Sequence, residues 1–489
     1  MSYIHLAHLS FHYDNSDEMI FEDVTLHLDS RWHLGLVGRN GRGKTTLLKL
    51  IHGDLKANGA LQKDVKTRYF PYPVKDPTKQ TADIVTEIIG DLDWRVYKEL
   101  NLLKVDASVL FQPYQTLSPG EQTKILLACL FIHDDDFVLI DEPTNHLDED
   151  GRALVSAYLQ NKQGFILVSH DRAFLDGCID HVLAINKNSI ALTQGNLSTY
   201  LENRSRQEHD EQMRQIHLKK DIARLQQAAG KTAVWSDRVE KSKIGAADKG
   251  YVGHMAAKMM KRSKTIEKRY ERYIEEKKSL LRDSEEIEEL KLHPCTGKSG
   301  RIIALDEVSV CYGSKTVLSH FRLTVNSGQK ICLRGANGAG KSTVLKLLAG
   351  LLKPNSGKVL ASNDLKIAYA FQDTMHLTGS FQDYLTNHQI DGVLCRAILH
   401  KLGFHQQLFT LPLENLSQGQ KKKVVLAGVL AQAADLYLFD EPLNYIDLDS
   451  RMQLEKLLKK TTMTCVFVEH DRAFCQAVAT ETYTFLPKK

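Results

Sequence analysis

Two glycine-rich segments carry the residues with the clearest chemistry in this sequence. Gly38–Thr45 and Gly335–Ser342 both fit the pattern G-x-x-x-x-G-K-[ST], and their lysines stand 297 positions apart. In such a loop, backbone N–H groups at the start of a helix surround phosphate groups. The lysine reaches the terminal phosphates and the hydroxyl reaches Mg²⁺. The sequence therefore predicts two phosphate-binding sites that use Mg²⁺.

An acidic pair ends an apolar run in each half of the chain, as Asp141-Glu142 and Asp440-Glu441. A strand that delivers two adjacent carboxylates to a phosphate site suits Mg²⁺ and water. The first carboxylate would hold the metal, directly or through water, and the second would accept a proton from the attacking water. Such a pair alone usually just ends a strand, but its position after the phosphate loop favours the catalytic interpretation.

A histidine follows a further apolar segment in each half, and His170 and His470 stand 300 positions apart. A histidine at a strand end can donate a hydrogen bond to a γ-phosphate oxygen and so sense it. A lone histidine is more often structural. Its repetition at the same offset favours a role in catalysis.

A serine and a glycine open a helical run between the loop and the acidic pair, in Leu117–Glu121 and in Leu416–Gln420. A helix start with these residues forms a second phosphate cradle. It cannot face the nucleotide of its own loop if both helices leave the same region of the sheet. We therefore expect it to serve another site.

Strands that alternate with helices must position these residues. Apolar strand-like runs precede both phosphate loops, and helical runs follow them at residues 47–51 and 344–348. This alternation is typical of α/β units around a largely parallel sheet. The repeat divides the chain into residues 1–199, an intervening segment 200–300, and residues 301–489.

The spacing of apolar residues in the intervening segment predicts an antiparallel helical hairpin, with its tip at about 235–253 and arms on the order of 60 Å long. The alternative is a charged, solvated spacer. Two features argue against a spacer: apolar residues at every seventh position need a partner helix, and a spacer does not need the cluster of basic residues found around the tip. The apolar residues with helical spacing are Leu218, Ile222, Leu225 and Ala229, and then every seventh residue from Met259 to Ile287.

Composition and charge narrow the class of protein. The net charge is +4, yet Lys231–Tyr270 alone holds 11 Lys/Arg against 4 Asp/Glu. The eight cysteines form no C-x-x-C pair, which argues against a zinc site and a disulfide framework. The longest uncharged apolar stretch, Val424–Ala434, is shorter than the roughly 18 residues that span a membrane. The first residues lack a signal-peptide pattern. We expect a soluble, cytoplasmic protein.

These motifs, present twice, resemble those of the ATP-binding cassette superfamily. In that family two cassettes close head to tail and sandwich two ATP molecules with Mg²⁺. The resemblance implies that each phosphate loop shares its ATP with the Leu-Ser-x-Gly segment of the other half, and that Tyr13 and Tyr312 stack on adenine. The implied ATP ligands are Tyr13, Gly38, Asn40, Gly41, Gly43, Lys44, Thr45, Thr46, Tyr312, Gly335, Asn337, Gly338, Gly340, Lys341, Ser342, Thr343, Ser118, Gly120, Glu121, Ser417, Gly419 and Gln420. The implied Mg²⁺ ligands are Thr45, Asp141, Ser342, Gln372 and Asp440.

Two cassettes joined by a long helical linker resemble the ABC-F subfamily, which acts on ribosomes. The second half looks most like the antibiotic-resistance branch of the Lsa/Vga type. The chain has no inserted arm in its first half, which several housekeeping members carry. The resemblance implies a monomer whose cassettes pair internally and which binds the ribosome with ATP. It also implies contact with 23S rRNA near the peptidyl-transferase centre and with P-site tRNA, displacement of lincosamides, pleuromutilins and streptogramin A, and release on hydrolysis.

The linker tip would reach the drug site through its aromatic, apolar and basic side chains. The alternative that these residues only pack the end of the hairpin is equally open for any one of them. The candidates are Trp235, Lys241, Lys243, Tyr251, Val252, His254, Met255, Lys261, Arg262 and Lys264.

Departures from the family pattern predict two unequal ATP sites. Tyr72 stands where the second half has Gln372, the glutamine that couples Mg²⁺ and water to motion. Further departures are Pro119, Gln418, Leu443 and Glu469. The alternative functions are a housekeeping ABC-F translation factor and, with weaker support, a cassette ATPase that acts on DNA or serves a transporter.

Overall fold

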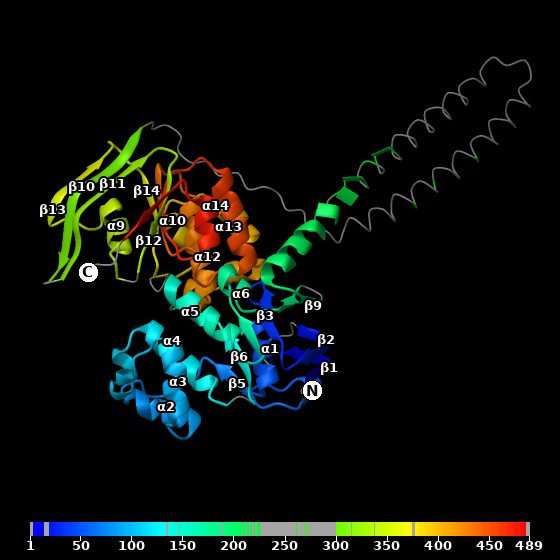
Figure 1. The fold of residues 1–489 in the computed structure, drawn as a ribbon. Helices are drawn as coiled ribbons and strands as arrows, with labels where there is room; N and C mark the ends of the chain where they lie inside the picture. The colour runs from blue at the N-terminus through cyan, green and yellow to red at the C-terminus, as the bar shows by residue number, and fades with distance from the viewer. Residues whose placement is uncertain are drawn as a thin grey trace, which may run out of the picture. The chain divides into compact units, whose positions relative to one another are not determined.

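The protein forms two compact units, one of Met1–Ser198 with Leu290–Lys489 and the other of Thr199–Glu289. Figure 1 shows the ribbon of this computed structural model. The residues that the structure describes are 3–13, 19–133, 135–145, 147–186, 189–207, 209–211, 213, 214, 216, 217, 220, 223, 224, 261, 268, 272, 300–313, 315–336, 338–373 and 377–485.

A six-stranded sheet lies at the centre of the first half. Its order is β5-β6-β7-β3-β8-β9, and all neighbours are parallel except β8 and β9. Apart from their terminal residues, the central strands are apolar and buried because both faces of the sheet are covered. The strands are β3 (His33–Gly38), β5 (Thr67–Phe70), β6 (Phe137–Asp141), β7 (Phe165–Val168), β8 (His181–Ile185) and β9 (Ile190–Gln194).

A second, antiparallel sheet in the order β2-β1-β4 completes this half with helix α1 (Lys44–His52). Leu6 of β1, Leu47 of α1 and Leu139 of β6 belong to one buried cluster. The two sheets and the helix that follows the phosphate loop therefore share one core. The strands are β1 (Tyr3–His12), β2 (Met19–Asp29) and β4 (Asn58–Lys63).

The second half repeats this architecture (Figure 1). Its parallel sheet has the order β14-β15-β16-β12-β17, and its antiparallel sheet the order β11-β10-β13. The prediction of two α/β cassettes is confirmed. The elements are β10 (Arg301–Tyr312), β11 (Lys315–Asn326), β12 (Lys330–Arg334), α9 (Lys341–Leu348), β13 (Ser356–Ala361), β14 (Ile367–Ala370), β15 (Leu436–Asp440), β16 (Cys465–Val468) and β17 (Glu481–Thr484).

Helices cover the sheets in both halves, and the predicted helical runs after Leu117 and Leu416 are helices α4 and α12. In the first half the helices are α2 (Thr81–Ile89), α3 (Trp94–Leu102), η1 (Ala107–Phe111), η2 (Tyr114–Thr116), α4 (Pro119–Leu130), α5 (Glu149–Gln160) and α6 (Arg172–Asp176). In the second half they are α10 (Phe381–Asn387), α11 (Gly392–Lys401), η3 (Gln406–Thr410), η4 (Leu413–Asn415), α12 (Gln418–Leu430), α13 (Leu448–Lys460) and α14 (Arg472–Val478).

The linker between the halves is described at only some of its residues. A helix covers residues 197–207, and the scattered described residues from 209 to 272 are helical. Most of the predicted hairpin, including its tip at 235–253, lies outside the described residues. Among the helices that the structure describes, none combines the length and the apolar character that a membrane span requires.

Candidate active sites

Each phosphate-loop lysine is held by the loop that it belongs to. Lys44 Nζ donates to the backbone oxygen of Gly38 at 2.7 Å, and Lys341 Nζ donates to that of Gly335 at the same distance. Burial lowers the pKa of both lysines, while the acidic residues nearby oppose this effect. Both ammonium groups therefore sit fixed at the mouth of a loop that can surround phosphates.

The last glycine of each loop is required by its backbone and by its neighbours. Gly43 and Gly340 have φ values of 86° and 101°, in the left-handed region that favours glycine. A Cβ on Gly43 would lie 2.5 Å from Ile20, and one on Gly340 would lie 2.9 Å from Val317. The next residue in each case begins a helix, so the free N–H groups of α1 and α9 point into the loop.

Oxygen atoms suited to Mg²⁺ come together beside each loop. Thr45 Oγ1 donates to Asp141 Oδ2 at 2.6 Å, and Ser342 Oγ donates to Asp440 Oδ1 at 3.3 Å. Mg²⁺ prefers hard oxygen ligands of this kind and keeps several waters. The donor set in both halves therefore fits Mg²⁺ bound with a nucleotide.

A tyrosine that the sequence analysis missed contacts each of these carboxylates. The Tyr69 hydroxyl donates to Asp141 Oδ2 at 3.1 Å, and that of Tyr369 is hydrogen-bonded to Asp440. Burial, followed by the charge of the aspartate, raises the pKa of both tyrosines, so both remain donors. The two tyrosines stand 300 positions apart, the same offset as the two histidines, and this repetition could have identified them from the sequence.

Removing both hydroxyls should misplace the two aspartates without removing them. We expect Tyr69→Phe with Tyr369→Phe to lower kcat roughly tenfold, since a hydrogen bond to a charged group contributes about 1.5–3 kcal/mol. The Mg²⁺ concentration for half-maximal ATPase activity should rise as well. The exposed Tyr97→Phe is the control. An unchanged Mg²⁺ dependence would contradict the positioning role.

The second carboxylate of each pair has a strained backbone. Glu142 and Glu441 have φ values of 53° and 48°, which is uncommon for residues other than glycine and is often found at functional sites. His170 Nε2 lies 3.2 Å from Glu142 Oε1, and His470 Nε2 lies 3.6 Å from Glu441 Oε1. Glu142 Oε1 is buried and, apart from this contact with His170, has no partner among the described residues. This carboxylate oxygen can therefore accept a hydrogen bond from a water molecule.

The electrostatic surroundings of the two glutamates differ. Burial, and then the charge of Asp141, raise the pKa of Glu142 to about 8. For Glu441 burial acts in the same direction, but the hydrogen bond from His470 and the nearby lysines outweigh it and lower the pKa. Gln372 Nε2 also donates to Glu441 Oε2 at 2.6 Å. The predicted inequality of the two sites thus has a counterpart in the charges around the proposed bases.

The Ser-x-Gly segments begin helices α4 and α12 with matching caps. Ser118 Oγ accepts from the backbone N–H of Glu121, whose carboxylate accepts from the Ser118 N–H, and Ser417 with Gln420 form the same box. This local structure explains why glutamate or glutamine follows the serine three residues later. Gly120 leaves the start of α4 partly exposed, whereas Gly419 is buried beside the backbone oxygen of Tyr445.

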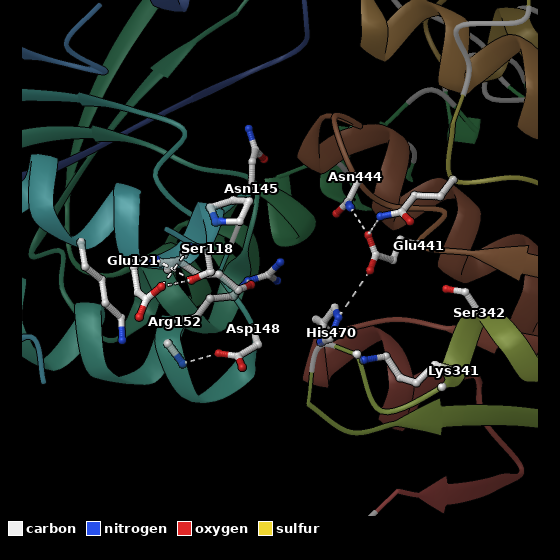
Figure 2. A pocket seen from close by; sticks show the side chains of 18 of the residues that line it. Ser118, Glu121, Asn145, Asp148, Arg152, Lys341, Ser342, Glu441, Asn444 and His470 are labelled. Atoms are coloured by element: carbon white, nitrogen blue, oxygen red, sulfur yellow. Dashed lines mark hydrogen bonds and ion pairs between the residues drawn. The ribbon is translucent and has the colours of Figure 1, made fainter. Parts of the chain in front are cut away.

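A pocket of about 730 Å³ contains residues of both halves, and Figure 2 shows how their side chains face it. This volume suits a nucleotide-sized ligand. The pocket brings the first Ser-x-Gly segment to the second phosphate loop. The lining residues that the sequence analysis had named as site residues are Ser118, Gly120, Glu121, Gly338, Gly340, Lys341, Ser342, Thr343, Gln372, Glu441 and His470.

Direct contacts join the first phosphate loop and the second Ser-x-Gly segment. Asn40 Nδ2 donates to the backbone oxygen of Tyr445 at 3.0 Å. A Cβ on Gly419 would lie 3.1 Å from the same nitrogen and 2.5 Å from the Tyr445 oxygen. The first phosphate loop therefore faces the second Ser-x-Gly segment at close range, and Gly419 is required there.

The remaining predicted residues are placed as follows. Tyr13 is half exposed, with its hydroxyl 3.0 Å from Thr46 Oγ1, and Tyr312 is also half exposed. Lys261 is an exposed helical residue. Asn337 of the second phosphate loop lies outside the described residues, as do the tip candidates other than Lys261. These are Trp235, Lys241, Lys243, Tyr251, Val252, His254, Met255, Arg262 and Lys264.

A comparison with protein families matches residues 21–145 and 318–444, just over half of the chain, to the family described as ABC transporter. Curated relatives extend the similarity along the chain. The ribosome protection protein VmlR of Bacillus subtilis is 28% identical over 95% of this chain and 83% of its own length. The ATP-binding protein Uup of Haemophilus influenzae is 29% identical over 98% of this chain and 78% of its own. The probable ATP-binding protein YheS of Escherichia coli K12 is 27% identical over 96% of this chain and 77% of its own length.

Solved structures share the fold. The archaeal ribosome recycling factor aABCE1, in complex with the ribosomal stalk protein aP1, is 19% identical, with a TM-score of 0.62 over 98% of this chain and 88% of its own. A structure named RNase-L Inhibitor is 20% identical, with a TM-score of 0.60 over 94% of this chain and 84% of its own. At these identities the likeness shows the fold alone.

Proposed function

The chain belongs to the ABC transporter family as a tandem-cassette ATPase of the ABC-F type, and we propose that it binds the bacterial ribosome in its ATP-bound state. We further propose that it displaces antibiotics that act at the peptidyl-transferase centre. The similarity to VmlR along 95% of the chain carries this proposal, because that relative is named a ribosome protection protein. The proposal places the chain in the cytoplasm with the ribosomes.

The proposed chemistry is ATP hydrolysis at two composite sites. Lys44 and Lys341 bind the terminal phosphates, while Glu142 and Glu441 accept the proton of the attacking water. Thr45 with Asp141, and Ser342 with Asp440 and Gln372, would hold Mg²⁺, which supplies charge neutralisation at the phosphates. The serine and glycine of the opposite half close each site. His170 and His470 donate to the γ-phosphate.

ATP binding would draw the two cassettes together, since each nucleotide contacts residues of both. Hydrolysis removes the γ-phosphate that joins the halves and so permits release. In this proposal 23S rRNA near the peptidyl-transferase centre and P-site tRNA are the ribosomal contacts of a monomeric protein. Lincosamides, pleuromutilins and streptogramin A are the drugs displaced.

A housekeeping translation factor without drug protection is the second candidate. Uup and YheS, which are named only as ATP-binding proteins, are 29% and 27% identical, close to the 28% of VmlR, so overall similarity does not decide between drug protection and a function without it. Expression in a susceptible Gram-positive host separates them. We expect raised inhibitory concentrations for the three drug classes, and unchanged concentrations for all of them would favour the housekeeping function.

The basic stretch 231–270 should hold the ribosome through RNA phosphates. We expect reversal of Lys241, Lys243, Lys261, Arg262 and Lys264 to glutamate to weaken ribosome binding at least tenfold and to reduce its salt dependence, because affinity for nucleic acid falls steeply with salt when lysines neutralise phosphates. ATPase activity in the absence of ribosomes should stay unchanged.

The control for these reversals uses exposed lysines of the cassettes, with the same number of charges reversed. Suitable positions are Lys98, Lys353, Lys358, Lys456 and Lys459. Binding should be titrated by co-sedimentation at several salt concentrations. Equal losses in the two sets would show that net charge alone matters, and no loss in the first set would make the basic stretch a solvated face.

A further inference from the structure

A buried lysine on helix α12 connects three parts of the second cassette. Lys422 is only 2% exposed. Its Nζ donates to the backbone oxygens of Phe371 at 3.0 Å and Asp440 at 3.1 Å, and it lies 3.5 Å from that of Gln372. An ammonium group has three donors and no acceptor. All the direct partners in this arrangement are main-chain oxygens, so the lysine fixes backbone segments rather than a side chain.

The segments that Lys422 joins are those that carry the proposed chemistry of the second site. Asp440 ends β15 and is followed by Glu441, the proposed base. Gln372 donates from its side chain to Glu441 Oε2 at 2.6 Å. Asn444 donates to the same oxygen at 2.6 Å (Figure 2). A shift of the Lys422 ammonium would therefore move two backbone segments that orient Glu441.

The helix that carries Lys422 begins at the other site. Ser417 caps α12, and Gly419 approaches Asn40 of the first phosphate loop. Lys422 lies about one helical turn after these residues. A short rigid helix segment thus runs from the face of the first site to the carboxylates of the second.

The first cassette lacks this connection. Thr123 occupies the position that corresponds to Lys422, and its hydroxyl donates to the backbone of Pro119 in its own helix. The same cassette has Tyr72 where Gln372 stands. By contrast the next lysine is present in both halves, as Lys124 and Lys423. The connection is therefore a specific difference between the cassettes.

We propose that Lys422 is a positioning residue that couples the two ATP sites in one direction. Closure of the second Ser-x-Gly segment on ATP at the first site is transmitted through Lys422 to the Gln372 segment and to the end of β15. This aligns Glu441 for hydrolysis at the second site. The coupling rests on the proposed sharing of each ATP between the cassettes. The first site, without such a lysine, receives no matching signal from the second.

A double-mutant cycle on the full-length protein tests this coupling. All variants carry Glu142→Gln, so that the turnover measured is that of the second site. Lys44→Ala perturbs ATP binding at the first site from a helix other than α12, and Lys422→Met removes the ammonium while keeping an unbranched stem. We expect each change alone to lower kcat about tenfold, with little change in KM, and the two together to lower it no further.

A purely structural lysine gives a different result, because the two effects would then multiply to about a hundredfold. Lys422→Arg, which keeps the charge and the donors, should restore most of the turnover. Lys421→Met on the same helix is the matched control and should leave kcat unchanged. If Lys422→Met does not fold, the same cycle with Lys422→Gln decides the question.

The result separates this inference from the proposed ATPase sites. Multiplicative effects, or a Lys422→Met variant with unchanged kcat, would overturn the coupling while leaving the two sites in place. Absence of turnover in the Glu142→Gln parent would instead contradict the proposed role of Glu441.

Discussion

Replacing both Glu142 and Glu441 by glutamine should lower ATP hydrolysis at least about 100-fold, because general-base catalysis typically contributes 10²–10⁴ in rate. ATP binding should persist, since the phosphate-loop lysines and the Mg²⁺ ligands are unchanged. Glutamine keeps the size and the acceptor oxygen of glutamate but cannot take a proton from water. Phosphate release measures the first quantity, and equilibrium binding of a fluorescent ATP analogue measures the second.

The single variants add information on the inequality of the sites. A histidine lies beside each glutamate, but Gln372 and Asn444 also donate hydrogen bonds to Glu441. We therefore expect Glu142→Gln and Glu441→Gln to lower turnover by different factors. Glu87→Gln with Glu481→Gln, at exposed positions, is the control. Normal hydrolysis by the double variant would make the assignment of the bases wrong.

Replacing residues 240–252 by a short Gly-Ser turn should abolish drug protection while ribosome binding and ATPase activity largely survive. The physical reason is reach: arms on the order of 60 Å would make the tip the part of the chain that approaches a deep drug site. Aromatic and apolar tip side chains could stack on rRNA bases or reshape the drug pocket. Inhibitory concentrations in cells and drug release from ribosomes in vitro measure the effect.

A second tip variant separates reach from side-chain contacts. A Gly-Ser segment of the same length keeps the span of the tip but removes residues such as Tyr251 and Met255. If contacts matter, this variant should also fail to protect. Full protection by the short-turn variant would contradict the role of the tip. Its residues would then only pack the end of the hairpin.

Much of the fold and of the ATP sites could be predicted because the signals are local. The residue types of Gly38–Thr45 describe a loop and a helix start within eight positions, and α1 begins where that pattern requires. The acidic pairs end β6 and β15 as the apolar runs before them indicate. Repetition of each motif at nearly the same offset then gives the two cassettes.

Contacts between distant positions could not be predicted in the same way. Lys422 lies in a run of three lysines, a pattern that normally indicates a solvated face, and only the fold shows that its ammonium reaches Phe371 and Asp440. Tyr69 resembles an ordinary strand residue until β5 pairs with β6 and brings it to Asp141. The conformation of the tip is not set by helical periodicity, which describes only the arms.

Nucleotide-dependent binding to ribosomes tests the central claim most directly. The Glu142→Gln, Glu441→Gln variant should be sedimented with purified bacterial ribosomes in the presence of ATP, ADP or no nucleotide, at fixed salt. Since the variant holds ATP without hydrolysing it, we predict stoichiometric co-sedimentation with ATP and little with ADP or without nucleotide. Equal recovery in all three conditions, or no recovery with ATP, would contradict the account.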